Sequence, residues 1–215
     1  MKSTRSRVSV SHRPPRRLGS GEPAAPGTGN DPIAMRLLLL RHAKSAWDVA
    51  GLADFDRPLA PRGRRAATMI GEHLATHRLV PDRILCSSAR RTRETLMGLM
   101  PMIPSDLDIR ITRDLYDVGA DAYLDCIGAL GGNARHLMLI GHNPSIQDTA
   151  LELIGNGNPA LREEIAAKFP TAGLAVIDFD IHKWSELRPR TGRIVAFFRP
   201  RELELVGGEP VIDDE

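Results

Sequence analysis

The stretch MRLLLLRHAKSAW, residues 35–47, places four consecutive leucines directly before an arginine and a histidine. Apolar residues at successive positions are typical of a strand whose two faces are both covered, so residues 36–41 are predicted to form a central strand of a parallel sheet. A buried strand needs no basic side chains at its end. Arg41 and His42 therefore need a chemical explanation rather than a packing one.

Outward from this strand, apolar segments alternate with amphipathic ones. The predicted strands are 36–41, 82–88, 107–112, 135–142, 173–180 and 193–200. The predicted helices are 61–79, 90–100, 121–130 and 143–154. This α/β alternation predicts a three-layer α/β/α sandwich with a mostly parallel central sheet. The last two strands are expected to pair antiparallel at one edge of that sheet.

Three predicted strands end in polar or basic side chains. Arg41 and His42 end the first, residues 87–91 (SSARR) follow the second, and His142 ends the strand 135–142. The carboxyl ends of parallel strands share one edge of a sheet, where ligands bind, so these side chains should be neighbours. Two arginines and two histidines at one crevice favour a tetrahedral phosphate as ligand. A neutral imidazole there is a suitable nucleophile.

The chain shows neither a glycine-rich phosphate loop nor a strand-end pair of carboxylates that would hold magnesium. We therefore expect no metal and no cofactor. The net charge of +2 is uneven: residues 1–34 carry +4 and the rest carries −2, so the folded part is not a basic nucleic-acid binder. No apolar run is long enough to cross a bilayer. Cys86 and Cys126 are expected to be free, buried thiols of a cytoplasmic protein.

The two ends of the chain differ in composition from the rest. Residues 1–34 are rich in Ser, Pro, Gly and Arg without apolar periodicity, which predicts a disordered basic extension. Two other interpretations stay open for this segment: a transit peptide, or sequence upstream of a true start at Met35. Residues 206–215 are predicted to be an acidic tail. The folded domain is expected to span residues 35–205.

Several motifs resemble, in the same order, those of the histidine phosphatase superfamily, which is phosphoglycerate mutase-like in fold. They are LRHAKS (40–45), CSSARRTRETL (86–96) and LIGHNPSI (139–146). Two further segments resemble the SixA-type phosphohistidine phosphatases of that superfamily. They are DFDRPLAPRGRRAA (54–67) and FPTAGLAVIDFD (169–180). The resemblance covers roughly residues 36–200 and is more specific than any single motif.

The resemblance implies a role for four residues of the predicted crevice. His42 would be the nucleophile that forms a phosphohistidine intermediate. Arg41 and Arg91 would bind the phosphoryl oxygens, and His142 would complete the pocket and stabilise charge in the transition state. Arg91 is chosen over its neighbours because it stands four residues before Thr95, which is the family's spacing.

The general acid is less well marked. Larger family members carry an acidic residue after the third strand, where this chain offers Asp114, Asp117 and Asp121. Asp117 is the candidate acid, since the chain should re-enter the crevice after the Leu-Tyr pair. Lys44 and Ser45 either contact substrate or begin a polar loop.

The resemblance implies a metal-independent phosphatase, SixA-like in acting on phosphohistidine in a protein. Three alternatives stay open: a small-molecule phosphomonoesterase of the same superfamily, a non-catalytic module that binds phosphorylated ligands, and a metal-dependent hydrolase using His73 and His77. The expected partner is a phosphorylated protein or a small phosphate ester, without nucleic acid or membrane. A monomer is expected.

Overall fold

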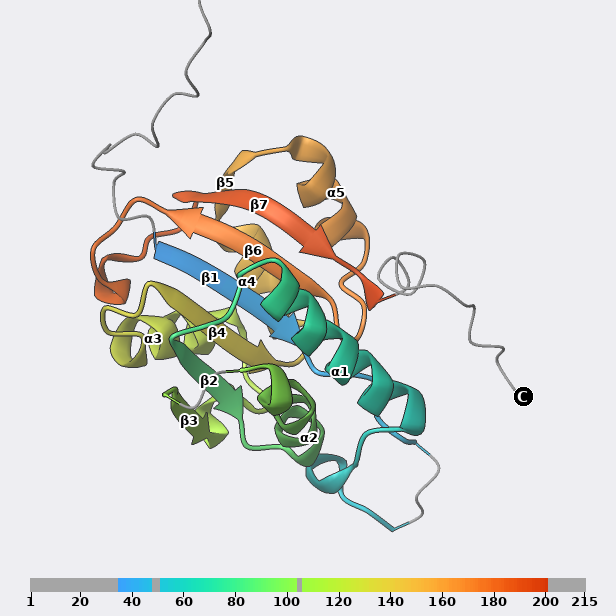
Figure 1. Ribbon diagram of the computed structural model, residues 1–215. Coiled ribbons are helices and arrows are strands. Elements are labelled where there is room, and N and C mark those ends of the chain that lie inside the picture. The colour runs from blue at the N-terminus through green and yellow to red at the C-terminus, as the bar shows by residue number, and fades with distance from the viewer. Residues whose placement is uncertain (1–34, 48–50, 104–105, 201–215) are drawn as a thin grey trace, which may run out of the picture. The chain divides into compact units, whose positions relative to one another are not determined.

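The computed structural model describes residues 35–47, 51–103 and 106–200 of the chain. Its centre is a seven-stranded sheet with the order β3-β2-β4-β1-β6-β7-β5 (Figure 1). The strands are β1 (Met35–Arg41), β2 (Arg83–Ser87), β3 (Asp108–Thr112), β4 (His136–Gly141), β5 (Ile154–Gly157), β6 (Leu174–Phe179) and β7 (Gly192–Phe198). Within this sheet only β6 runs against its neighbours. The predicted mostly parallel sheet is confirmed.

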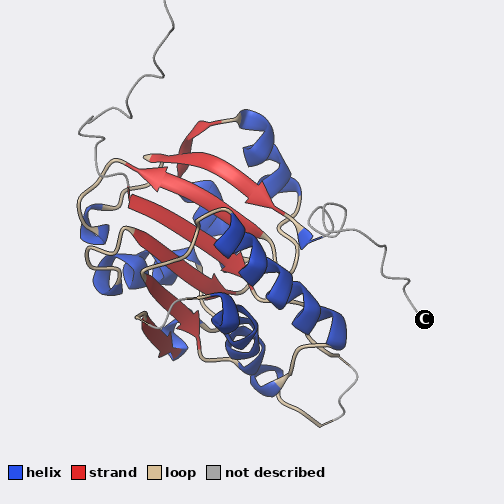
Figure 2. Ribbon diagram, in the orientation of Figure 1, coloured by secondary structure: helices blue, strands red, loops and turns tan. Residues whose placement is uncertain are grey.

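Helices cover both faces of the sheet (Figure 2). They are α1 (Pro61–Thr76), α2 (Arg90–Leu99), α3 (Ala120–Leu130), α4 (Ser145–Leu153) and α5 (Pro159–Ala167). One apolar cluster contains the buried side chains of α1 and α2, and the other contains those of α3, α4 and α5. The helices therefore form two layers with the sheet between them, which confirms the α/β/α sandwich.

β1 lies in the middle of the sheet, paired in parallel with β4 and antiparallel with β6. Its four leucines are fully buried and alternate between the two apolar clusters. Leu37 and Leu39 pack with α3 and α4, and Leu38 and Leu40 pack with α1 and α2. Each buried leucine contributes about 1.5–3 kcal/mol relative to an exposed one. β1 is thus a rigid support for the residues that follow it.

The expected antiparallel pairing of the last two strands is confirmed for β6 and β7, but their place at the sheet edge is wrong. The short strand β5 pairs in parallel with β7 and forms that edge. Its sequence, IGNG, lacks the β-branched pattern of a strand. The backbones pack so closely there that a Cβ on Gly155 would lie 1.7 Å from the Arg190 carbonyl oxygen. The glycine is needed for that contact, and it hides the strand from pattern analysis.

The remaining expectations concern the two ends of the chain, its cysteines and membrane-crossing helices. The predicted terminal segments 1–34 and 206–215 lie outside them. Cys86 and Cys126 are free and buried, as expected. Across residues 35–47, 51–103 and 106–200, none of the helices has the length and apolarity that a bilayer crossing requires.

Candidate functional site

The predicted convergence of strand ends occurs at the carboxyl edge of the sheet. In the β1–β4 ladder Arg41 lies opposite Gly141, so His42 and His142 leave adjacent strands at the same level. Their ring centroids are 5.2 Å apart. Both histidines are 7% exposed. Two imidazole rings therefore lie side by side at the carboxyl ends of the strands, where ligands of parallel sheets bind.

The His42 ring is oriented by the chain that follows it. Its Nδ1 lies 2.7 Å from the carbonyl oxygen of Ala43. A carbonyl oxygen only accepts, so Nδ1 carries the proton and Nε2 keeps its lone pair. Burial lowers the pKa of His42 to about 3, and the charges of Arg91 and Arg41 act in the same direction. His42 is thus a neutral imidazole with Nε2 available as a nucleophile.

His142 is fixed through both its ring and its backbone. Its Nε2 lies 2.9 Å from the Ser87 hydroxyl at the end of β2. Its backbone N–H donates to the Tyr123 hydroxyl at 3.0 Å, and that hydroxyl donates to the Leu115 carbonyl. Burial and the nearby charge of Arg91 lower the pKa of His142 to about 3. Its Nδ1 is buried and has no partner among the described residues, so it is free to interact with a group bound in the site.

Arg41 turns from the end of β1 toward the loop before β6. Its Nη1 donates to the Phe169 carbonyl at 2.7 Å. Burial, together with the charge of Arg91, lowers the pKa of the Arg41 guanidinium. A bound anion would offset the repulsion that Arg41 experiences from the charge of Arg91.

Arg91 is the arginine of α2 that faces the site, as expected from its spacing. It is 7% exposed, whereas Arg90 is exposed and pairs with Glu94. Thr95 lies one helical turn later and donates its hydroxyl to the Arg91 carbonyl. The same hydroxyl accepts the backbone N–H of Ala43 at 3.0 Å. Thr95 therefore attaches the first turn of α2 to the loop that carries His42.

Asp54, in the short 3₁₀ helix η1 (Asp54–Asp56), is a site residue that the sequence did not reveal. Arg91 donates from Nη1 to its carbonyl oxygen at 2.6 Å and from Nη2 to its Oδ2 at 2.9 Å. The Tyr116 hydroxyl donates to the same Oδ2 at 3.0 Å. Arg57 donates to Oδ1 at 2.8 Å. One carboxylate thus joins three side chains from separate parts of the chain.

The charge state of Asp54 follows from these contacts. Burial alone would raise its pKa, but the hydrogen bonds from Tyr116 and Arg57 and the charge of Arg91 outweigh burial and lower it. Asp54 is therefore ionised near neutral pH. The sequence signal for it was weak: an acid beside an arginine in the segment DFDR is also what a solvated loop looks like.

The remaining predicted site residues are placed less centrally. Ser45 is buried, and its hydroxyl accepts from Arg57 at 2.8 Å. The Lys44 carbonyl accepts the Ala60 N–H at 2.9 Å, which holds the loop after β1 to the start of α1. Asp117 is exposed, has a left-handed φ of 57°, and shows no hydrogen bond to the described residues. Its role as general acid stays a prediction.

His73 and His77 form a stacked pair of rings. Their ring centroids are 4.0 Å apart, and His73 also packs against Phe198. Among the described residues, no group of three His, Cys, Asp or Glu side chains is placed to hold a metal ion.

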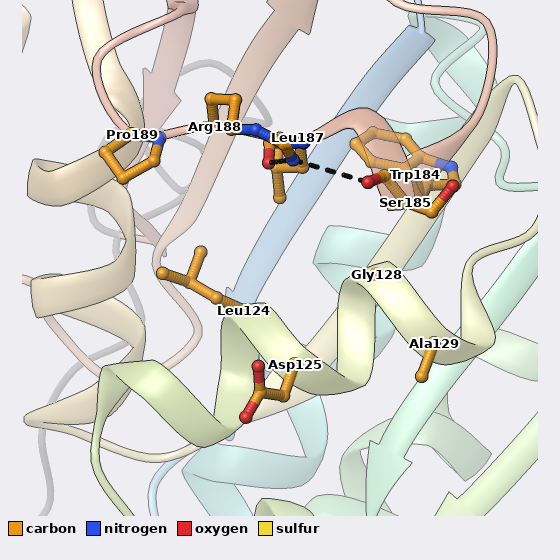
Figure 3. A pocket seen from close by; sticks show the side chains of 9 residues that line it. All are labelled: Leu124, Asp125, Gly128, Ala129, Trp184, Ser185, Leu187, Arg188 and Pro189. Carbon is orange, nitrogen blue, oxygen red and sulfur yellow. Dashed lines mark hydrogen bonds between the residues drawn. The ribbon is translucent and has the colours of Figure 1, made fainter.

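A surface pocket of about 330 Å³ lies elsewhere on the domain (Figure 3). Its lining comes from α3 and from the loop that contains the 3₁₀ helix η4 (Trp184–Glu186). That loop follows β6, whose last residue, Phe179, pairs with Met35 at the start of β1. The pocket therefore lies at the opposite end of β1 from His42.

Comparison with known families and proteins identifies relatives of this chain. A family described as the histidine phosphatase superfamily (branch 1) matches residues 37–123. An uncharacterized protein of Mycobacterium tuberculosis is 37% identical over 166 residues, which cover 75% of this chain and 100% of the relative. An uncharacterized chloroplastic protein of Arabidopsis thaliana is 30% identical over 189 residues, which cover 80% of this chain and 78% of the relative.

Solved structures of the same fold include two SixA proteins. The proposed phosphohistidine phosphatase SixA of Agrobacterium tumefaciens is 34% identical, with a TM-score of 0.66 over 77% of this chain and 98% of that one. The corresponding protein of Nakamurella multipartita is 31% identical, with a TM-score of 0.68 over 78% of this chain and 96% of that one. The fold is thus shared along nearly the whole length of these relatives.

Proposed function

The chain belongs to the histidine phosphatase superfamily, and on that premise we propose that it hydrolyses phosphoryl groups through a phosphohistidine intermediate on His42. The observation that carries the proposal is the environment of His42. Its ring is neutral, its Nδ1 is occupied by the Ala43 carbonyl, and its Nε2 is left bare. Arg41 and Arg91 supply the positive charge around it.

In the first step Nε2 of His42 attacks the phosphorus atom, and the bond from phosphorus to the leaving group breaks. The guanidinium groups of Arg41 and Arg91 bind the equatorial oxygens and stabilise the charge that develops on them. His142, attached to Ser87, faces His42 across the site. Because Nδ1 of His42 donates to Ala43, the ring can carry the positive charge that forms on it.

In the second step a water molecule attacks the phosphorus atom of phosphohistidine. The bond between phosphorus and Nε2 breaks, inorganic phosphate leaves, and His42 returns to its neutral form. The same arginines hold the phosphoryl group in both steps. Positioning and electrostatic stabilisation supply the rate acceleration, and no step needs a metal ion.

We propose phosphohistidine in a protein as the substrate. The relatives that support this are the two SixA structures, which are 34% and 31% identical. The site itself is consistent with a leaving group that needs little acid catalysis, since Asp54 is ionised and Asp117 is exposed. An imidazole nitrogen is readily protonated by solvent, whereas an alkoxide depends on an acid in the site. Asp117 remains our candidate acid for ester substrates.

The surroundings of the site also fit a protein substrate. The connection between β3 and α3 spans only residues 113–119, which leaves no room for a long insertion over the crevice. A phosphorylated side chain of a protein can therefore reach the site.

The two cysteines bear on where the protein works. Two buried free thiols, Cys86 and Cys126, support a reducing setting such as the cytoplasm.

The proposal is tested by hydrolysis assays in the presence of a chelator. The substrates are a histidine-phosphorylated protein, an aryl phosphate and an alkyl phosphate. We expect activity in the first two assays and its loss in His42→Ala. Arg91→Ala should lower kcat/KM about a hundredfold or more, while the exposed neighbour variant Arg90→Ala stays near wild type. An active His42→Ala protein would refute the mechanism, and a preference for the alkyl phosphate would refute the substrate.

A further inference from the structure

The carboxylate of Asp54 accepts hydrogen bonds from three side chains, one of which is Arg91. It accepts from Arg91 of α2, from Tyr116, which follows β3, and from Arg57, which follows η1. Arg57 in turn donates to the Ser45 hydroxyl and the Ala46 carbonyl, and its guanidinium lies 3.4 Å from the centroid of the Trp47 ring. Asp54 therefore connects the loop after His42 with the arginine that binds the phosphoryl group.

We propose that Asp54 is a positioning residue that aligns Arg91 for the transition state, an inference that rests on the function proposed above. Its carbonyl and its carboxylate each hold one terminal nitrogen of the guanidinium, at 2.6 and 2.9 Å. A planar guanidinium held at two nitrogens cannot rotate, because its five N–H donors have fixed directions. The donors that Asp54 does not use are then fixed in direction for a phosphoryl oxygen.

Because Asp54 is exposed, its role in positioning Arg91 can be distinguished from a contribution to the stability of the fold. The side chain of Asp54 is 53% exposed, while that of Arg91 is 9% exposed. An ion pair with one partner in solvent contributes little to the free energy of unfolding. Loss of the carboxylate should consequently alter the alignment of Arg91 and leave Tm nearly unchanged.

The negative charge of Asp54 gives a second way to recognise its positioning role. A fixed negative charge beside Arg91 opposes the binding of any phosphate in the ground state. An aligning carboxylate therefore weakens phosphate binding while it speeds the chemical step. Removing it should move kcat and phosphate affinity in opposite directions, which a simple loss of local structure would not do.

The test uses Asp54→Ala and Asp54→Asn in the full chain, with Asp56→Asn as matched control. Asp56 lies in the same 3₁₀ helix and is exposed. We measure kcat on an aryl phosphate, inhibition by inorganic phosphate, and Tm. Asp54→Ala should lose about tenfold to a hundredfold in kcat and bind inorganic phosphate more tightly. Asp54→Asn keeps an acceptor for Arg91 and should lose less kcat, and Asp56→Asn should match wild type.

An unchanged kcat in Asp54→Ala would overturn the inference, and so would a loss of kcat accompanied by weaker phosphate binding and a lower Tm. Equal losses in Asp54→Asn and Asp54→Ala would also contradict it, because the acceptor would then have no effect. The proposed function is judged separately through His42→Ala. If that variant is inactive while the Asp54 variants behave like wild type, only the positioning role fails.

Discussion

His42 is the residue whose protonation the chemistry depends on most. The Ala43 carbonyl places the proton on Nδ1, and burial lowers the pKa of the ring to about 3. We expect nitrogen-15 NMR of histidine-labelled protein at pH 6 to show His42 neutral, with Nδ1 protonated and Nε2 bare. The exposed His77 serves as an internal comparison. A doubly protonated ring, or the opposite tautomer, would contradict this description of the nucleophile.

The sequence predicted four of the side chains at the centre of the site but did not reveal Asp54. Arg41, His42 and His142 are recognisable because each lies at the end of a buried strand, and Arg91 because the resemblance to the family implies an arginine four residues before Thr95. Asp54 is 37 positions away from Arg91 along the chain and lies in a loop. Its contact depends on how that loop folds back onto α2, which neither periodicity nor composition encodes.

Helix α1 packs against the loop that follows β1 and carries His42, and their backbones are in close contact at Gly63. A Cβ on Gly63 would lie 2.1 Å from the Lys44 carbonyl oxygen. We expect Gly63→Ala to destabilise the protein by about 1–3 kcal/mol, since backbone must move to admit the methyl group. The displaced loop carries His42, so kcat should fall as well. Urea unfolding and the aryl phosphate assay measure the two effects.

Gly128 in α3 provides the matched control for this prediction. The nearest atom to its Cβ position is the Trp184 carbonyl oxygen at 3.9 Å, an ordinary contact. Gly128→Ala should therefore gain helix propensity of up to about 1 kcal/mol and keep its activity. If both variants behaved alike, close packing at Gly63 would not be the cause.

Sequence patterns predicted the helices and strands well where apolar periodicity was strong. β1, with buried leucines at four successive positions, is one example, and the helices α1 to α4 lie within about three residues of their predicted ends. β5 was missed because Gly155 and Gly157 give it no strand pattern, and its pairing with β7 depends on tertiary contacts. Sequence patterns thus predicted the elements that build the core. They did not predict the edge strand β5, which forms only through its contact with β7.

For the whole molecule, the buried histidines make stability depend on pH. The pKa values of His42 and His142 are about 3 in the folded protein against an ordinary value of 6.5, and that of His73 is about 4. Below pH 6.5 the unfolded chain binds protons that the folded chain excludes. Stability that is present above pH 6.5 should therefore be lost progressively as the pH falls toward 3.

Urea unfolding at pH 7, 6 and 5 measures this dependence. We expect the free energy of unfolding to fall across the series, and the variant His73→Leu to show a shallower slope than wild type. Near pH 5, unfolding should take up close to one proton for each of the three histidines. A flat profile from pH 7 to pH 5 would mean that these rings are charged in the folded protein.

The proposed phosphatase mechanism depends on one covalent species, a phosphohistidine on His42. Rapid mixing with a phosphorus-32-labelled, histidine-phosphorylated protein, followed by alkaline quench, should trap a phosphoenzyme that is stable to alkali and labile to acid. We predict that peptide mapping places the label on His42 and that His42→Ala accumulates none. Turnover without a labelled enzyme, or a label on any residue other than His42, would contradict a phosphohistidine intermediate on His42.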